Sequence, residues 1–248
     1  MKSKYLKVKD HNIHYLTEGY GEYLIILPSL WATSKIFEEI GEKLAKHYSV
    51  IIPDIYKGKS KFNKPTRNIN DCVFLLKSFL DKLKLEKYYL LGASYSGVIA
   101  TLFSNTHPKR IKKLLLISTS ATSINIKRKW LMLFTGYSKL LWNNFLTKKK
   151  TKKDYLKIPD TIKFLLTHPR QFINEAFIVT KNYDQPTTEM RVPSKLIFAE
   201  KDEFMSVQQA VEVHSQIKNL EIEVVDKTHS WGFVEQEEMV KMIKDYFK

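Results

Sequence analysis

The chain has 248 residues, of which 44% are hydrophobic and 27% charged, values typical of a soluble globular protein with a sizeable core. No run of about 18 apolar residues occurs, which excludes a membrane-spanning helix. The single cysteine, Cys72, excludes an internal disulfide and a metal site built from cysteines. The length fits one α/β domain that carries an insertion, or two small domains.

The formal net charge of +15 raises the question of a nucleic-acid partner. The positive charge is mostly lysine, in a chain rich in Ile, Asn and Tyr, a combination that codon bias alone can produce. The sequence lacks the aromatic and basic signature of a nucleic-acid module. We therefore expect a lysine-rich surface that faces water, and no nucleic-acid partner.

The start of the chain bears on location. Residues 1–8 pass into a strand-like pattern without the apolar stretch of a secretory signal. Cys72 lies in the apolar pattern of a helix, which is typical of a buried, inert thiol. Both observations predict a cytoplasmic protein.

Strand-like and helical patterns alternate along most of the chain. The strand-like runs are 5–8, 13–17, 23–27, 49–53, 88–91, 113–117, 195–199 and 221–225. Helical periodicity covers 34–46, 70–83, 94–106, 207–217 and 235–246, with Ser34 and Asn70 as predicted N-caps of the first two. Two hairpin-like strands followed by this alternation predict an α/β fold, a mostly parallel sheet of about eight strands with helices on both faces.

Residues 123–190 interrupt the alternation with helical and loop patterns but no convincing strand. They include 13 Lys and Arg against 5 Asp and Glu, and so hold about half of the excess positive charge. Helices inserted between two strands of such a sheet lie over the strand ends, where substrates bind. We therefore predict a core domain of residues 1–122 and 191–248, with 123–190 as a helical cap, or lid.

Within the predicted cap, residues 127–153 combine an aromatic-rich apolar stretch with basic ends, Lys127-Arg128-Lys129 and Lys148-Lys149-Lys150. Such a segment suits an interfacial helix in weak peripheral contact with an anionic membrane. We favour the alternative, in which the apolar side chains line a pocket and the lysines face water. Under either interpretation the pocket beneath the cap is apolar.

The most informative pattern lies in residues 88–105. A short apolar run leads into Gly92-Ala93-Ser94-Tyr95-Ser96, and a helical segment follows directly. This order of strand, sharp turn and helix is typical of a nucleophile elbow, in which the chain folds back and the residues two away from the serine must be small. Gly92 and Ser96 both meet this requirement. The alternative is that Ser94 is an ordinary helix N-cap.

Other parts of the chain, together with this elbow, resemble the α/β-hydrolase family. Leu27-Pro28-Ser29-Leu30-Trp31 occupies the place of the family's Leu-x-His-Gly-like turn, and Pro53-Asp54-Ile55-Tyr56-Lys57-Gly58-Lys59-Ser60 is similar to its Asp-x-x-Gly-x-Gly-x-Ser loop, one residue short. Val192-Pro193 leads into Leu196-Ile197-Phe198-Ala199-Glu200-Lys201-Asp202, which is similar to the strand and loop that carry the family's acid. Thr228-His229 follows the last strand, where the family usually has Gly-His. The resemblance covers nearly the whole length outside the predicted cap.

The resemblance implies a catalytic triad in the family's chain order, with Ser94 as nucleophile, Asp202 as acid and His229 as base. Glu200 and Glu203 are neighbouring carboxylates that compete with Asp202 for the acid's role. Asp54 is expected to hold its own turn rather than to take part in the chemistry.

The resemblance also implies an oxyanion hole made of two backbone N–H groups. One belongs to Tyr95, the residue after the nucleophile, and the other most simply to Leu30. The Pro28-Ser29 pair replaces the family's His-Gly in the turn that carries Leu30. Backbone donors need no particular side chain, so the hole depends on whether this loop keeps its shape.

These observations predict a cofactor-independent serine hydrolase without a metal site, of the carboxylesterase or lipase-like kind. It would act on a small-molecule ester with a hydrophobic acyl or alkyl group, through an acyl-enzyme on Ser94. A C–C bond hydrolase or an acyltransferase would use the same triad, because fold and triad do not fix the substrate. Two hypotheses from other classes stay open. One is a ligand-binding or receptor-like homologue with little turnover, motivated by Pro28-Ser29, and the other is a peripheral membrane protein whose cap carries the function. The sequence leaves the oligomeric state open.

Overall fold

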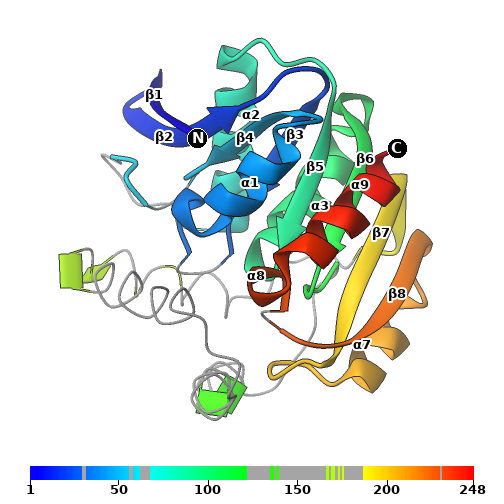
Figure 1. Ribbon diagram of the computed structural model, residues 1–248. Helices are drawn as coiled ribbons and strands as arrows, with labels where there is room; N and C mark the ends of the chain where they lie inside the picture. The colour runs from blue at the N-terminus through cyan, green and yellow to red at the C-terminus, as the bar shows by residue number, and fades with distance from the viewer. Residues whose placement is uncertain are drawn as a thin grey trace.

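One twisted sheet organises the molecule, with helices packed on both of its faces (Figure 1). The structure is a computed structural model that describes residues 1–29, 32–55, 58–61, 68–121, 135–136, 138–139, 166–167, 169–170, 173, 175, 187–229 and 231–248. In these ranges eight strands lie in the order β1-β2-β4-β3-β5-β6-β7-β8. Strand β2 runs antiparallel to β1 and β4, and every other neighbouring pair is parallel. The predicted fold class is thereby confirmed.

The strand bounds follow the predicted runs and mostly extend them. The strands are β1 (Lys2–Val8), β2 (His11–Glu18), β3 (Tyr23–Leu27), β4 (Ser49–Pro53), β5 (Tyr88–Ala93), β6 (Ile111–Ile117), β7 (Glu189–Lys201) and β8 (Lys218–Thr228). In β3, Leu24 and Ile26 face one hydrophobic cluster while Ile25 and Leu27 face the other. A strand covered on both faces is apolar at every position, which is why the sequence pattern located β3 and β4 so closely.

The helices divide into two layers. One layer holds α2 (Ile69–Lys82), α3 (Tyr95–Thr106) and α7 (Val207–His214). The other holds the 3₁₀ helix η1 (Ser34–Phe37), α1 (Glu38–Leu44), α8 (Trp231–Val234) and α9 (Gln236–Phe247), and a short 3₁₀ helix, η2 (Pro108–Arg110), precedes β6. Helix α2 buries Cys72, Leu76 and Phe79 at helical spacing, so the lone thiol belongs to the core.

Both predicted N-caps are wrong. Helix α2 is capped by Asn68 instead of Asn70, since the Asn68 side chain accepts the Asp71 N–H at 2.9 Å from an extended backbone. Asn70 lies inside the first turn of the helix. A capping side chain must come from the residue before that turn, which is Asn68. Ser34 is the first residue of η1, and its hydroxyl donates to Asp54 at 3.1 Å instead of capping a helix.

Strand β7 is much longer than the predicted run 195–199 and begins at Glu189. Its pairing with β8 shifts register between Glu189 and Ser194, a stretch that contains Pro193, which has no N–H to give to a ladder. The last two residues of the predicted cap, 189 and 190, therefore lie in the sheet. Most of the remaining cap range lies outside the described residues.

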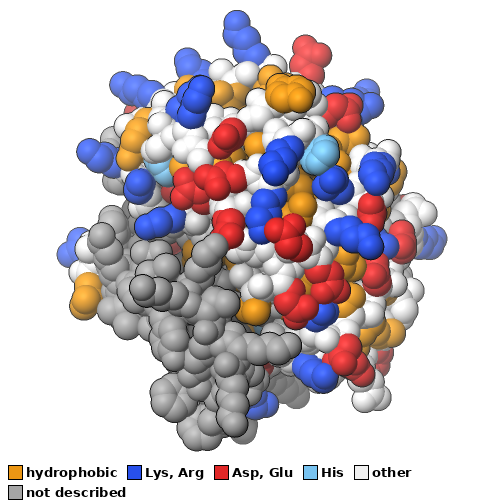
Figure 2. All heavy atoms as spheres, viewed as in Figure 1, with side chains coloured by type: hydrophobic (Ala, Val, Ile, Leu, Met, Phe, Trp, Pro, Cys, Tyr) orange, Lys and Arg blue, Asp and Glu red, His pale blue; other side chains and the backbone are white. Residues whose placement is uncertain are grey.

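The face formed by α1 and α9 carries both signs of charge. Figure 2 shows acidic and basic side chains interspersed there rather than gathered by sign. Lys43 of α1 lies 2.7 Å from Glu237 of α9, and Lys227 lies 2.8 Å from Glu238. This face is therefore not a uniform basic patch. None of the described helices combines the length and apolar composition that a bilayer crossing requires.

Candidate active site

Ser94 sits at a sharp turn between β5 and α3. Its backbone has φ 52° and ψ −128°, a conformation that residues other than glycine rarely adopt. Hydrogen bonds hold the turn: the Ser94 N–H donates to the Ile117 carbonyl at 2.8 Å, and its carbonyl accepts from Gly97 N–H at 3.0 Å and from the Thr119 hydroxyl. Such strain persists only where the surroundings enforce it, and it often marks a functional position.

The residues around Ser94 are as small as the elbow requires. A Cβ added to Gly92 would lie 2.7 Å from the Cα of Gly97, and one added to Gly97 would lie 2.3 Å from Thr119. Ser96 stands where the family has glycine. Its side chain is accommodated in the elbow because its hydroxyl forms hydrogen bonds with the backbone. The Ser96 Oγ accepts the Ala93 N–H at 3.0 Å and lies 2.6 Å from the Leu27 carbonyl, to which it donates.

The structure brings Ser94, His229 and Asp202 together. The Ser94 Oγ lies 3.0 Å from His229 Nε2, and His229 Nδ1 lies 2.6 Å from Asp202 Oδ2. A carboxylate only accepts, so in the neutral ring Nδ1 carries the proton and Nε2 is left to accept from the serine. The Asp202 side chain is 1% exposed and that of His229 14%, so the acid is enclosed while the imidazole meets the surface.

The loop after β7 also fixes the two carboxylates beside His229. Asp202 Oδ1 accepts the N–H groups of Phe204 and Met205 at 2.9 and 3.2 Å, which orients Oδ2 toward the imidazole. Glu203 contacts the backbone of His229 instead, accepting its N–H at 2.9 Å. Of the neighbouring acids, Glu203 therefore holds the loop of His229 while Asp202 contacts its ring. The Phe204 ring packs on the imidazole with centroids 4.5 Å apart.

Ser94 does not act as a helix cap through its side chain. It occupies the N-cap position of α3, yet its hydroxyl makes no capping hydrogen bond. The hydroxyl lies against His229 instead. The alternative interpretation of Ser94 as an ordinary N-cap therefore loses its physical basis.

Of the two expected oxyanion donors, the structure describes one. Tyr95 is the first residue of α3, so its amide belongs to the helix N-terminus, where amides lack intrahelical acceptors and negative charge is stabilised. Burial raises the pKa of the Tyr95 phenol well above its ordinary value, with smaller contributions from Cys72 and Glu175. Leu30 lies outside the described residues. Next to it in the chain, the Ala32 N–H donates to the Ser29 carbonyl at 3.1 Å.

Two described residues of the predicted cap range lie close to this site. A Cβ on Gly136 would lie 2.4 Å from the Phe204 ring, which itself packs on His229. Glu175 is 2% exposed and its charge acts on Tyr95. Within this range, Gly136 thus approaches Phe204, and the charge of Glu175 contributes to the raised pKa of Tyr95.

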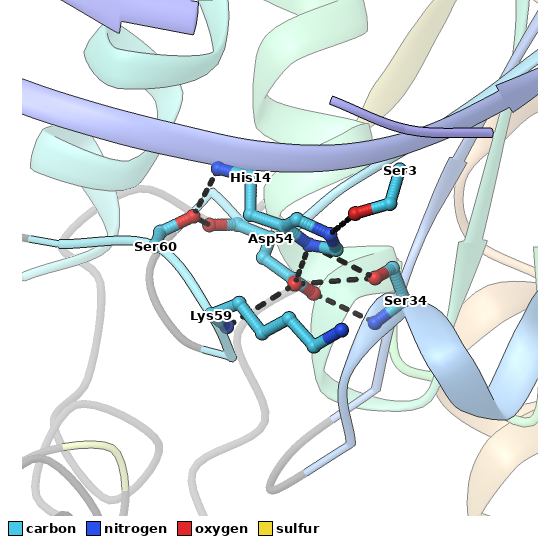
Figure 3. A network of polar contacts seen from close by, with 6 residues as sticks. All are labelled: Ser3, His14, Ser34, Asp54, Lys59 and Ser60. Carbon is cyan, nitrogen blue, oxygen red and sulfur yellow. Dashed lines mark hydrogen bonds and ion pairs between the residues drawn. The ribbon is translucent and has the colours of Figure 1, made fainter. Parts of the chain in front are cut away.

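A second polar network is centred on Asp54, the residue that follows β4 (Figure 3). Its Oδ2 lies 2.7 Å from His14 Nδ1, and its Oδ1 accepts the Ser34 N–H at 2.6 Å. His14 Nε2 in turn lies 2.8 Å from the Ser3 hydroxyl. His14 and Asp54 are 1% and 0% exposed, so the pair is fully enclosed.

Asp54 also holds its own turn, as the sequence pattern suggested. Its Oδ2 accepts the Lys59 N–H at 3.4 Å, and its carbonyl accepts the Ser60 hydroxyl at 2.7 Å. Gly58 has φ 70°, and a Cβ there would lie 2.4 Å from the carboxyl carbon of Asp54. The link from Asp54 to Ser34 and His14 had no local signal, because these residues lie 20 and 40 positions away.

Within the described ranges, no group of three or more His, Cys, Asp or Glu side chains is arranged to hold a metal ion.

A model of the α/β hydrolase fold family matches residues 22–154, more than half of the chain. The chain therefore belongs to the α/β hydrolase fold family.

Solved structures show the same architecture. The enol-lactonase from Burkholderia xenovorans aligns with a TM-score of 0.80 and 17% identity, over 98% of this chain and 99% of its own. The meta-cleavage product hydrolase from Pseudomonas fluorescens aligns with a TM-score of 0.78 and 15% identity, over 98% and 97%. At these identities the likeness shows the shared fold.

A curated relative matches over a shorter stretch. An uncharacterized protein of Mycobacterium tuberculosis is 23% identical over 110 residues, which are 44% of this chain and 32% of that protein. The match thus spans about a third of the relative's length.

Proposed function

We propose that the protein is a serine hydrolase that forms an acyl-enzyme on Ser94 and acts on esters of a hydrophobic acyl or alkyl group. The observation that carries the proposal is the Ser94 hydroxyl, held at a strained elbow 3.0 Å from His229 Nε2. A serine hydroxyl alone is a poor nucleophile, and a base within hydrogen-bond reach is what activates it.

In the proposed reaction, the Ser94 Oγ attacks the ester carbonyl and its proton moves to His229 Nε2. The tetrahedral intermediate collapses, and the alcohol leaves with that proton. Water then attacks the acyl-enzyme, giving its proton to His229, which returns it to the Ser94 oxygen as the acid departs. Asp202 holds the imidazole tautomer and stabilises the imidazolium, through the 2.6 Å contact with Nδ1.

The oxyanion of each intermediate needs donors that are already in place. We assign these to the backbone N–H groups of Tyr95 and Leu30. The position of Tyr95 at the N-terminus of α3 supports the first assignment. In other hydrolases one such donor is worth about 3–4 kcal/mol of transition-state stabilisation.

The preference for a hydrophobic ester rests on the apolar, aromatic-rich composition of residues 127–153. The two similar structures carry different chemistry in their names, a lactonase and a meta-cleavage product hydrolase. A C–C bond hydrolase or an acyltransferase is therefore the closest competing proposal, and a binding homologue with little turnover is the more distant one.

The first test is labelling with a fluorophosphonate probe, followed by intact mass and peptide mass spectrometry, on the wild type and on Ser94→Ala. We expect one label per chain at Ser94, and none in the variant. Ser104→Ala is a matched control, because Ser104 is buried in the same helix and donates to the Thr101 carbonyl at 2.8 Å.

A series of p-nitrophenyl esters then tests the substrate class. We expect kcat/KM to rise with acyl length as the apolar pocket fills. A labelled protein that hydrolyses none of these esters would favour the C–C hydrolase or acyltransferase. A folded wild type that takes up no label would favour the binding homologue.

The cytoplasmic location is part of the same proposal and rests on cysteine usage, since the lone thiol Cys72 is buried and forms no disulfide. Cell fractionation with an antibody to the protein tests it. Recovery from a secreted or periplasmic fraction would reject this location.

A further inference from the structure

The chain bends sharply where β6 ends, next to the elbow that carries Ser94. Ser118, the first residue after β6, has φ 44°, a conformation that residues other than glycine rarely adopt. Ser118 and Thr119 are each 4% exposed, and the Ser118 N–H donates to the Ile197 carbonyl of β7 at 2.9 Å. The sheet thus holds this bend, and the bend places Thr119 against the backbone of Ser94.

The end of β6 holds the backbone of Ser94 on both sides. The Ser94 N–H donates to the Ile117 carbonyl at 2.8 Å, and the Ser94 carbonyl accepts the Thr119 hydroxyl. The Gly97 N–H donates to the same carbonyl at 3.0 Å. Thr119 Oγ1 also lies 3.5 Å from the Ser120 carbonyl, which is the more distant acceptor. The single proton of the Thr119 hydroxyl is therefore directed at Ser94.

The carbonyl of Ser94 belongs to the same peptide group as the N–H of Tyr95, the oxyanion donor assigned above. The group is planar and trans, so its C=O and N–H bonds point in opposite directions. A hydrogen bond that fixes the direction of the carbonyl therefore fixes the direction of the N–H as well. It also polarises the peptide group, which strengthens the N–H as a donor. Thr119 can thus act on an amide through the other side of its peptide group.

Resting on the proposed function, we propose that Thr119 is a positioning residue of the hydrolysis, whose hydroxyl aims the oxyanion donor of Tyr95 through the Ser94–Tyr95 peptide group. The donor must point to where charge develops in the transition state, and displacements of about 1 Å cost large factors in rate. The same hydrogen bond helps to enforce the positive φ of Ser94, which directs the nucleophile toward His229.

The side chain of Thr119 has two parts, and each can be removed separately. A Cβ added to Gly97 would lie 2.3 Å from the Thr119 Cγ2 and 2.4 Å from its Oγ1, so both parts lie against Gly97. Thr119→Val keeps the shape and the methyl group but loses the hydroxyl. Thr119→Ser keeps the hydroxyl and loses the methyl group. A packing role is therefore retained in the first variant, and the proposed role is retained in the second.

The experiment measures kcat, KM, the melting temperature and the affinity for a boronic acid, which forms a tetrahedral adduct on the serine, in the full chain. We expect Thr119→Val to lower kcat about 10- to 50-fold and boronic-acid affinity in parallel, with KM within about twofold, because the oxyanion forms only in the transition state. Thr119→Ser should keep kcat within about threefold even where its melting temperature falls.

Thr101→Val is the matched control. Thr101 is 2% exposed in α3, and among the described residues its hydroxyl has no hydrogen-bond partner. This variant removes a buried threonine hydroxyl from the same helix, so kcat and boronic-acid affinity should stay at the wild-type values.

The outcomes separate the two proposals. A wild type that labels at Ser94 and turns over esters, with Thr119→Val at wild-type kcat and boronic-acid affinity, would overturn this inference alone. Equal losses of kcat in Thr119→Val and Thr119→Ser would also overturn it, because the effect would then follow packing. A wild type that neither labels nor turns over esters would overturn the proposed function, and this inference with it. Where Thr119→Val does not fold, Thr119→Ala replaces it, and its comparison with Thr119→Ser isolates the hydroxyl.

Discussion

Two sets of serine, histidine and aspartate lie in this molecule with nearly the same spacing. In one, Ser94 lies 3.0 Å from His229, which lies 2.6 Å from Asp202. In the other, Ser3 lies 2.8 Å from His14, which lies 2.7 Å from Asp54. Distances alone do not tell the two apart, so the difference must lie in what surrounds them.

The two serines lie in different backbone conformations. Ser94 has a positive φ between β5 and α3, and it directly precedes the first residue of that helix. Ser3 lies within β1, an edge strand, and pairs with Leu16 of β2. An extended edge strand offers no helix N-terminus to a developing oxyanion.

The two acids also differ in what their oxygens do. The Asp202 Oδ2 that holds His229 is oriented by two amide bonds to the other oxygen. The Asp54 Oδ2 that holds His14 also accepts from the Ser34 hydroxyl and the Lys59 N–H. Asp54 thus binds several neighbouring groups and holds local structure. The side chain of its partner His14 is 2% exposed, against 14% for that of His229. In the proposed function, only the relay at the strained turn beside a helix N-terminus is catalytic, and the enclosed relay of Asp54 holds local structure.

The largest expected effect separates the two serines. Ser94→Ala should lower kcat/KM by about 10⁴-fold or more, because no other group then attacks the substrate. Ser3→Ala should leave kcat/KM within about twofold. Steady-state hydrolysis measures both, and peptide mapping after fluorophosphonate treatment of Ser94→Ala should find no label on Ser3. A label on Ser3 would break the comparison.

The next effect separates the two acids. Asp202→Asn should lower kcat by about 10⁴-fold, since an amide favours the wrong tautomer of His229. Asp54→Asn should lower it by no more than about 100-fold, because Asp54 contacts His14 and Ser34 and is not the proposed acid. Single-turnover acylation rates measure both. Equal losses in the two variants would mean that the two networks act on the same step.

A smaller effect tests the strain at Ser94. Ser94→Gly should unfold at higher denaturant than Ser94→Ala, with a free energy of unfolding about 1 kcal/mol greater, because glycine adopts a positive φ without cost. Ser3→Gly should instead be about 0.5–1 kcal/mol less stable than Ser3→Ala, as glycine weakens a strand. Urea unfolding of the four variants gives the two differences, and the same sign at both positions would contradict the contrast.

The smallest effect concerns another buried histidine, His214, whose ring forms hydrogen bonds with the backbone. Its Nε2 accepts the Ala121 N–H at 3.0 Å, and its Nδ1 lies 2.6 Å from the Ala210 carbonyl. Burial lowers the pKa of His214 below its ordinary value of 6.5, so the unfolded chain binds the proton more readily than the folded one. Its contribution to stability is therefore present above pH 6.5 and is lost as the pH falls below that value.

His214→Gln should reduce the dependence of the melting temperature on pH, measured in thermal melts above and below pH 6.5. His107, whose pKa burial also lowers, acts in the same direction and stays in both proteins. An unchanged slope in the variant would assign the dependence to other groups.

Much of the fold was accessible from sequence because burial leaves a local pattern. The runs at 23–27 and 49–53 match β3 and β4, since both strands are covered on both faces. The elbow was accessible for a related reason, as the small residues Gly92 and Ser96 reflect a close approach within five positions.

The side-chain contacts that the sequence did not predict lie between segments far apart in the chain. His14, Ser34 and Asp54 meet only because β2 and β3 both lie next to β4, an order that no periodicity encodes. The N-cap Asn68 was missed for a subtler reason. Asn70 has the same side chain two residues later. Only the backbone conformation, extended at Asn68 and helical at Asn70, shows which of the two is the cap. The role of Leu30 stays a prediction.

The enclosure of Cys72 in α2 has a practical consequence for spectroscopy. It is the chain's single cysteine and it is 0% exposed, so thiol-directed reagents meet little background in the native protein. A cysteine introduced at an exposed position of the predicted cap, such as Lys139→Cys, would carry a spin label or fluorophore as the one reactive thiol. The label would then report whether the surroundings of residue 139 change when an ester is added, on an otherwise unmodified chain.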